Sequence, residues 1–320
     1  MSNSKIKVLA EDGGKRLDIF LVGQFPEESR SFWQKQIKSG AVSVNGEQPS
    51  VHQFLKIGDE VEIIKTKKHK NIKTKTIKYK LVFECADYLV VEKPVGLLTH
   101  SAACEPGMAD QIIKDYPEIK KVGDDLPAEV LGATKPNGFS AVREVGGRWG
   151  IVHRLDKDAS GLLVVARTPK FFENIKKQFK ERQVKKIYLA LVYGEIAKDE
   201  DILEFAIGRA ESGRMAARAE GEEGREAKTR INVLKRFKNY TYLSAQILTG
   251  RTHQIRTHLL AYGHGIVGDE LYQTRKQKIK SVCDRLFLHS HILGFADAAG
   301  NYVEYESKLP KELENCLKNL

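Results

Sequence analysis

The chain has 320 residues, of which 41% are hydrophobic and 30% charged, so it is long enough to form two domains with buried cores. Its formal net charge of +11 favours a polyanionic partner such as nucleic acid, although a basic globular protein without such a partner is common. No run approaches the ~20 apolar residues of a membrane span, and the first residues lack the apolar stretch of a signal peptide. We therefore expect a cytoplasmic protein with no membrane partner.

The four cysteines, Cys85, Cys104, Cys283 and Cys316, stand far apart and form no Cys-x-x-Cys pair. This spacing argues against a zinc site and against a disulfide framework. We expect reduced thiols and no metal.

Residues 1–64 predict a small domain of two helices followed by a hairpin. Trp33 and Ile37 would share one face of the second helix, and Gly40 is suited to end it. Asn45-Gly46 follows alternating valines and is the strongest short-range hairpin signal. This order of elements resembles the S4 RNA-binding domain.

In an S4 domain, basic residues of the second helix and the nearby loop meet the phosphate backbone. The resemblance therefore implies RNA contacts by Arg30, Lys35 and Lys38. The alternative is that these side chains form only the solvated face of a helix.

Residues 65–80 are rich in lysine and contain no acidic residue, which is typical of an extended linker. From residue 81 the composition becomes globular, so we place a second domain at 81–320. Within it, residues 126–150 carry several glycines and prolines without periodicity and are interpreted as an irregular insertion.

Two polar clusters stand out in the second domain. The first, His153–Gly161, lies between apolar runs, of which residues 162–166 predict a buried strand. The second, 249–260, follows a strand predicted at 240–248 and begins a helix. Polar loops held between buried strands can aim reactive groups, although a charged turn is the simpler interpretation.

The remaining pattern alternates strands and helices. Thr168-Pro169 is typical of an N-cap followed by the first residue of a helix. Further strands are predicted at 88–91, 186–194, 286–291 and 302–305, a long hairpin at 207–230 and a terminal helix at 310–320.

Five blocks in sequence order resemble the RluA/RluD-type family of pseudouridine synthases. The blocks are Glu92-Lys93-Pro94-x-Gly96, His153-Arg154-Leu155-Asp156 with Ser160-Gly161-Leu162, Tyr188-x-Ala190-x-Val192-x-Gly194, Gly250-Arg251-Thr252-His253-Gln254-Ile255-Arg256-x-His258, and Gly263-His264 to Gly268-Asp269. The resemblance implies an α+β fold whose catalytic domain has a mixed, mostly antiparallel sheet, with the S4-like domain at its N-terminal side. It also implies an isomerase that converts uridine in RNA to pseudouridine and needs no cofactor.

By this resemblance Asp156 is the catalytic carboxylate, and it either attacks the ribose or takes a proton from it. Arg256 is its expected partner, since a guanidinium keeps a carboxylate charged and oriented. Tyr188 falls where the family places an aromatic ring against the uracil, although a strand tyrosine is usually a core residue. Asp158 is the main rival to Asp156, with a cap as its alternative role.

The resemblance also implies that Arg154 fills the space left by the flipped nucleotide, with His153 beside it at the substrate. Lys93, Arg251 and His253 would hold the RNA backbone or order the loop. The expected substrate is large-subunit ribosomal RNA, with transfer RNA as an open alternative, and the protein is expected to be a monomer.

Two other functions compete with this prediction. One is an RNA-binding ribosome-assembly factor that kept the fold but lost catalysis. The other is a metal hydrolase built from histidines, although their spacing fits no standard site. The histidines concerned are His253, His258, His264, His289 and His291.

Overall fold

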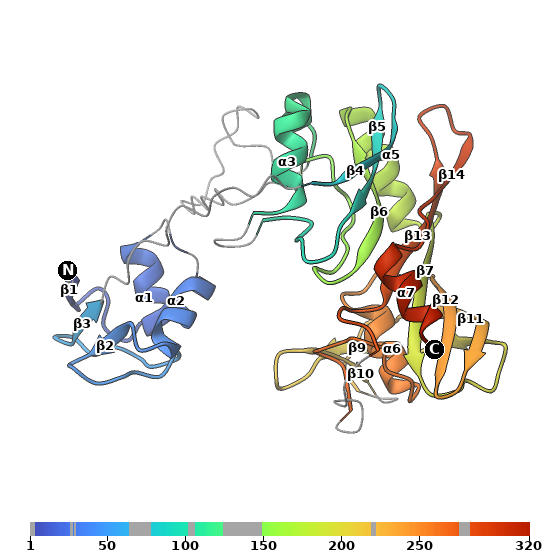
Figure 1. Ribbon diagram of the computed structural model, residues 1–320. Helices are drawn as coiled ribbons and strands as arrows, with labels where there is room; N and C mark the ends of the chain where they lie inside the picture. Colours follow the sequence, from blue (N-terminus) through green and yellow to red (C-terminus); the bar gives the residue numbers. More distant parts are fainter. Residues whose placement is uncertain are drawn as a thin grey trace. The chain divides into compact units, whose positions relative to one another are not determined.

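The computed structural model describes residues 4–25, 28, 30–63, 78–101, 106–123, 149–218, 222–274 and 282–320. These residues belong to two compact units, one within Met1–Ile77 and one from Lys78 onward (Figure 1). The expected linker at 65–80 and the expected insertion at 126–150 fall mainly outside the described residues, so both remain predictions.

The first unit has a three-stranded sheet in the order β1-β3-β2 and two helices. Its elements are β1 (Ser4–Lys7), α1 (Leu17–Gln24), α2 (Arg30–Lys38), β2 (Val42–Val44) and β3 (Glu60–Ile63). Trp33 and Ile37 on α2 are both buried in one core, which confirms the predicted helical face. Asn45 and Gly46 both have positive φ, 54° and 81°, as a two-residue hairpin turn requires.

The sequence gives no signal for β1. Only one of its four residues, Ile6, is apolar, and the strand lies at the edge of the sheet beside β3. Its pairing with β3 is set by tertiary contact, because a short polar segment carries too little periodicity to be read as a strand.

Nine strands of the second unit form one sheet in the described part of the chain, in the order β4-β5-β6-β13-β7-β12-β11-β8, with β14 paired to β13. Their bounds are β4 (Lys80–Glu84), β5 (Tyr88–Lys93), β6 (Ser160–Ala166), β7 (Lys185–Tyr193), β8 (Glu200–Leu203), β11 (Thr229–Phe237), β12 (Tyr240–Ile247), β13 (Leu288–Ala296) and β14 (Tyr302–Glu306). Of these described pairings, only β6 with β13 is parallel. The predicted mixed, mostly antiparallel sheet is confirmed.

Helices pack against this sheet, and a two-stranded ribbon completes the unit. Their bounds are α3 (Met108–Asp115), η1 (Pro117–Lys121), α5 (Pro169–Lys180), β9 (Ala206–Arg209), β10 (Met215–Arg218), α6 (Gln254–Ala261) and α7 (Lys311–Lys318). Helix α5 contacts β6 and β13, and Figure 1 shows it beside β6. Among the described residues, no helix has the length and apolar character needed to cross a bilayer.

Strand β6 is buried along its whole length because both faces of the sheet are covered there. Leu162 and Val164 belong to the core that contains Phe171 of α5. Leu163 and Val165 belong to the core on the opposite face. Successive side chains of a strand point to opposite faces, so a strand between two cores is apolar at every position.

The N-terminal end of α5 follows the sequence prediction closely. Thr168 is the N-cap, and its Oγ1 accepts a hydrogen bond from the Phe171 N–H at 3.3 Å. Pro169 takes the first helical position, where its missing N–H is not needed.

Cys283 and Cys316 form a disulfide that joins the segment before β13 to α7. The expectation of reduced thiols is therefore wrong for this pair. Their separation of 33 residues carries no signal in the sequence, because the two meet only when α7 packs back onto the sheet. Cys85 is free.

Gly161 lies where β6 pairs with β13. Its φ is 114°, and a Cβ at this position would overlap the backbone of Ser290. The parallel pairing of Ser160 with His289 and of Gly161 with Ser290 therefore depends on a residue without a side chain.

We predict that Gly161→Ala destabilises the protein more than Gly300→Ala does. Both glycines have positive φ, but a Cβ at Gly300 would have no neighbour within 4 Å. The control should lose about 1–2 kcal/mol from backbone strain alone, and Gly161→Ala should lose more because β6 and β13 must separate. Thermal unfolding of both variants measures this, and equal losses would contradict the predicted overlap.

Candidate active site

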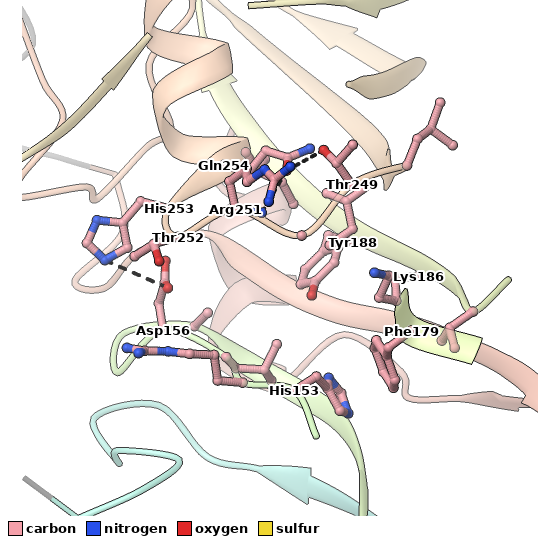
Figure 2. Close-up of a pocket in the computed structure, with 18 of the residues that line it drawn as sticks. His153, Asp156, Phe179, Lys186, Tyr188, Thr249, Arg251, Thr252, His253 and Gln254 are labelled. Carbon is pink, nitrogen blue, oxygen red and sulfur yellow. Dashed lines mark hydrogen bonds and ion pairs between the residues drawn. The ribbon is translucent and has the colours of Figure 1, made fainter. Parts of the chain in front are cut away.

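A cavity of about 580 Å³ lies in the second unit (Figure 2). The loop before β6, helix α5, strand β7 and the turn that leads into α6 all contribute to its lining. The structure therefore brings the two polar clusters of the sequence to one place. Predicted site residues that line the cavity are His153, Arg154, Asp156, Tyr188, Arg251, His253 and Arg256.

Strand β13 explains why the loop before β6 meets β7. At its start, β13 pairs in parallel with β6, His289 opposite Ser160. On its other side it pairs with β7, Ser290 opposite Tyr188. Residues far apart in the chain are thus held across a single strand.

Asp156 carries its carboxylate at the wall of the cavity. The side chain is 16% exposed, and its Oδ2 accepts a hydrogen bond from Nη1 of Arg256 at 3.3 Å. Its Oδ1 lies 3.8 Å from Nε2 of His253. The carboxylate is therefore paired with a cation and still open to a ligand.

Arg256 is held more firmly than its partner. It is 2% exposed, and its Nε and Nη2 each donate to one oxygen of Asp269 at 2.7 Å. Its guanidinium also lies 5.0 Å from the ring centre of Tyr272. Although burial opposes it, the hydrogen bonds and charges of Asp269 and Asp156 raise the pKa of Arg256. The result is a fixed positive charge directed at Asp156.

The backbone around Asp156 is fixed by its neighbours. The Thr99 hydroxyl donates to the Leu155 carbonyl at 3.0 Å and accepts from the Leu155 N–H at 3.1 Å. Leu155 and Ala159, which precede and follow Asp156 in the chain, are both buried. The loop is therefore anchored at several points, which limits the positions that Asp156 can take.

Lys93 adds a further anchor to this loop. It is 0% exposed, and its Nζ donates to the carbonyls of Pro94, Leu97 and Lys157 at 2.9, 2.8 and 3.1 Å. Burial, followed by the charge of Arg285, lowers the pKa of Lys93 to about 7. Backbone oxygens enclose the Lys93 nitrogen, and contact of Lys93 with the RNA remains a prediction. Its other expected role, ordering the loop, agrees with this geometry.

Tyr188 is buried, yet it lines the cavity (Figure 2). Burial, and then the charge of Asp156, raise the pKa of its phenol, so the hydroxyl stays protonated. Both interpretations of this residue describe part of its environment, since it belongs to the core cluster and presents its ring to the cavity.

His153 is an uncharged part of the wall. Its Nε2 accepts a hydrogen bond from the Val164 N–H at 3.0 Å, and its ring stacks on Phe179 with 4.6 Å between centres. Burial, and then the charge of Lys186, lower its pKa to about 3. The imidazole is therefore neutral at physiological pH.

The segment before α6 is ordered by Gln254. Its Oε1 accepts from the Arg251 N–H at 3.0 Å and from the Thr249 hydroxyl at 2.8 Å. His253 takes the left-handed conformation with φ 56°, and its Nδ1 shares a hydrogen bond of 2.7 Å with the hydroxyl of Tyr272. Burial lowers the pKa of His253, while Asp156 opposes the shift.

Arg154 and Asp158 differ in their relation to the cavity. Arg154 is exposed and lines it. Asp158 is half-buried but does not line the cavity. Of the two rival carboxylates, Asp156 is the one that a ligand in the cavity would meet.

The basic residues expected to bind RNA in the first unit are placed only in part. Arg30 is half-exposed, and its Nε donates to Asp18 at 2.8 Å, so its charge is already paired. Lys38 is exposed at the end of α2. The side chain of Lys35 lies outside the described residues. RNA contact by all three remains a prediction.

Several residues of the site have no assigned role in the sequence analysis. Asp269 orients Arg256, and its only signal is the Gly268-Asp269 block of the family resemblance. Tyr272 follows this block by three residues, and Phe179 and Lys186 look like ordinary helix and strand residues. Only the folded arrangement brings them to the site.

The histidines proposed for a metal hydrolase are engaged separately. His258 bonds to the Phe205 carbonyl, His264 to the Tyr193 carbonyl and His289 to Ser160. Among the residues that the structure describes, no three His, Cys, Asp or Glu side chains are grouped as metal ligands would be. The metal-hydrolase alternative has no ligand set there.

Comparison with known proteins agrees with this site. A family model described as RNA pseudouridylate synthase matches residues 87–261, and a model of the S4 domain matches residues 15–61. An uncharacterized RNA pseudouridine synthase of Bacillus subtilis is 31% identical over 322 residues, which cover 100% of this chain and 99% of that protein. The ribosomal large subunit pseudouridine synthase D of Neisseria meningitidis serogroup B, strain MC58, is 32% identical, with 98% of this chain and 81% of that protein covered.

Among solved structures, human RNA pseudouridylate synthase domain containing 1 matches with a TM-score of 0.57 and 24% identity, over 75% of this chain and 88% of that one. At that identity the likeness shows the fold alone. The family model, the full-length relatives and the shared fold all agree, and the chain belongs to the RNA pseudouridylate synthase family, with an S4 domain on its N-terminal side.

Proposed function

We propose that this RNA pseudouridine synthase acts on large-subunit ribosomal RNA and that Asp156 is its catalytic residue. The observation that carries the proposal is the Asp156 carboxylate, open to the cavity and held by Arg256, which is itself clamped by Asp269. Ribosomal RNA is supported by relatives named ribosomal large subunit pseudouridine synthase D, and by the basic charge of the chain. A ribosomal substrate also favours the cytoplasm as the place of action.

The reaction rearranges one nucleotide without oxidation or consumption of water. The N1–C1′ bond breaks, the uracil rotates, and C5 bonds to C1′; C5 loses a proton and N1 gains one. Asp156 must be ionised for either of its routes, attack on the ribose or removal of a proton from it. Arg256 donates a hydrogen bond to this carboxylate at 3.3 Å, and the interaction strengthens when the nucleotide displaces water from the cavity.

The target base has to leave the helical stack before it can enter the cavity, at a cost of a few kcal/mol. We infer that the uracil packs against the ring of Tyr188, which faces the cavity beside Asp156. Arg154 is exposed at the cavity, where its long side chain can enter the space that the flipped nucleotide leaves in the RNA. His253, Arg251 and neutral His153 complete the walls.

We predict that Asp156→Asn abolishes pseudouridine formation, whereas Asp158→Asn leaves measurable activity. The amide of the first variant can neither attack the ribose nor accept its proton, but Asp158 lies outside the cavity lining. Pseudouridine formed in transcribed large-subunit RNA is the measurement. An inactive Asp158→Asn beside an active Asp156→Asn would overturn the assignment.

We also predict that Asp269→Asn lowers kcat by roughly 10²-fold, since small misplacements of a catalytic group have effects of this size. The amide cannot hold both Nε and Nη2 of Arg256 as acceptors, so the guanidinium turns away from Asp156. Glu312→Gln, which removes an exposed partner of Arg285, is the control and should keep wild-type kcat. An unchanged kcat for Asp269→Asn would contradict the orienting role.

The substrate is tested by mapping pseudouridines in the RNA of cells that lack the protein. Loss of a large-subunit ribosomal site, restored by wild-type protein but not by Asp156→Asn, supports the proposal. Loss of pseudouridine in transfer RNA alone would show that transfer RNA, and not ribosomal RNA, is the substrate. RNA binding without conversion would favour the alternative of a catalytically silent assembly factor.

A further inference from the structure

The cavity is strongly basic beyond the Asp156–Arg256 pair. Its basic lining residues are Arg154, Lys176, Lys180, Arg182, Lys186, Arg251 and Arg256. Among the described residues that line it, Asp156 is the one carboxylate, and its charge is already paired with Arg256. The cavity therefore has positive charge that can bind parts of the substrate other than the uracil.

Lys186 is the lysine buried most deeply in this wall. It is 9% exposed and stands two residues before Tyr188 on β7, so both side chains point to the same face of the strand. Figure 2 shows its nitrogen beside Tyr188 and near Phe179. The ammonium lies 5.2 Å from the ring centre of Phe179, at the distance of a cation–π contact.

No carboxylate pairs with Lys186 in the part of the chain that the structure describes. His153, whose imidazole interacts electrostatically with Lys186, is neutral because burial lowers its pKa to about 3. Burial lowers the pKa of Lys186 itself to about 8. An ammonium taken from water without an anion is destabilising, so this site is incomplete without a negatively charged ligand.

Lys185 shows the ordinary alternative one residue earlier. It points to the opposite face of β7, is about one-third exposed, and its Nζ donates to Glu304 at 2.9 Å. Two adjacent lysines of one strand thus differ in burial and in partner. Lys185 has an acidic partner at the surface, whereas Lys186 faces the cavity and has no acidic partner among the described residues.

We propose that Lys186 binds a phosphate of the target RNA strand next to the uridine that enters the cavity. The inference rests on the proposed function and extends it to the strand's backbone. Residues two apart on a strand are separated by about 6.6 Å, similar to the distance between a base and its own phosphate. With the uracil against Tyr188, a phosphate can therefore reach Lys186. The compact positive charge of a lysine ammonium is suited to binding a phosphate.

Lys186→Gln tests the proposal, with Lys185→Gln as the matched control that removes the same charge from the same strand. Both are made in the full chain with Asp156→Asn, so that binding is measured without turnover. The probe is transcribed large-subunit ribosomal RNA, and Kd is measured over a series of salt concentrations.

Lys186→Gln should weaken binding roughly tenfold or more at low salt, as expected for loss of a charged hydrogen bond. It should also lower the slope of log Kd against log salt concentration by about 0.7, the contribution of one phosphate contact to a single strand. Lys185→Gln should change neither quantity, and Lys186→Arg should keep the slope. A merely structural lysine would leave the slope unchanged.

Weaker binding with an unchanged slope would assign Lys186 to an uncharged group of the base and overturn the proposal, as would wild-type binding by Lys186→Gln. The midpoint temperature of thermal unfolding of Lys186→Gln should be at least as high as that of the wild type, because the substitution removes an unpaired buried charge. Lys186→Met, which keeps the apolar stem, repeats the measurement if the glutamine variant folds poorly. Absence of pseudouridine with the wild-type enzyme would instead refute the proposed function, whatever the slope.

Discussion

The site depends on the row of alternating charges formed by Asp156, Arg256 and Asp269, of which Arg256 and Asp269 are buried. Arg256 has little contact with water, so its charge is tolerable only with acidic partners, and removing one partner of such a buried pair costs about 3–5 kcal/mol. Asp269 accepts two short hydrogen bonds from the guanidinium and is itself held by the backbone N–H groups of Leu271 and Tyr272, whereas Asp156 accepts a single longer bond from Arg256. This asymmetry leaves the Asp156 carboxylate oriented and available to a ligand, as acid–base or nucleophilic chemistry requires.

The sheet provides the frame for this row. One parallel pairing in an otherwise antiparallel sheet brings the loop before β6 next to β13, and β7 lies on the other side of that strand. Gly161 permits the close approach, and Lys93 and Thr99 hold the loop through its backbone atoms. Stability and function are therefore coupled here, since the groups that anchor the loop also fix the position of the carboxylate.

The charge of the cavity extends the same logic to the substrate. Apart from Asp156, the described lining residues that carry charge are basic, and Lys186 lies among them with no acidic partner in the described part of the chain. Strand alternation separates it from Lys185, which has an ordinary surface partner. A negatively charged strand that delivers a single base into the cavity would satisfy both features, the basic wall and the aromatic ring of Tyr188.

The sequence by itself determined much of this protein. Strand alternation, the Asn45-Gly46 turn and the Thr168 cap predicted elements that the structure contains, because such signals are local. The motif blocks identified Asp156 and Arg256 as partners, and the structure places them 3.3 Å apart. Tertiary structure alone decided what depends on contacts between distant segments: the clamp by Asp269, the enclosure of Lys93, the disulfide of Cys283 with Cys316, and the exposure of Lys186 to the cavity. A lysine has the same signature in the sequence whether it pairs at the surface, binds backbone oxygens or faces a ligand, since only its neighbours in space distinguish these environments.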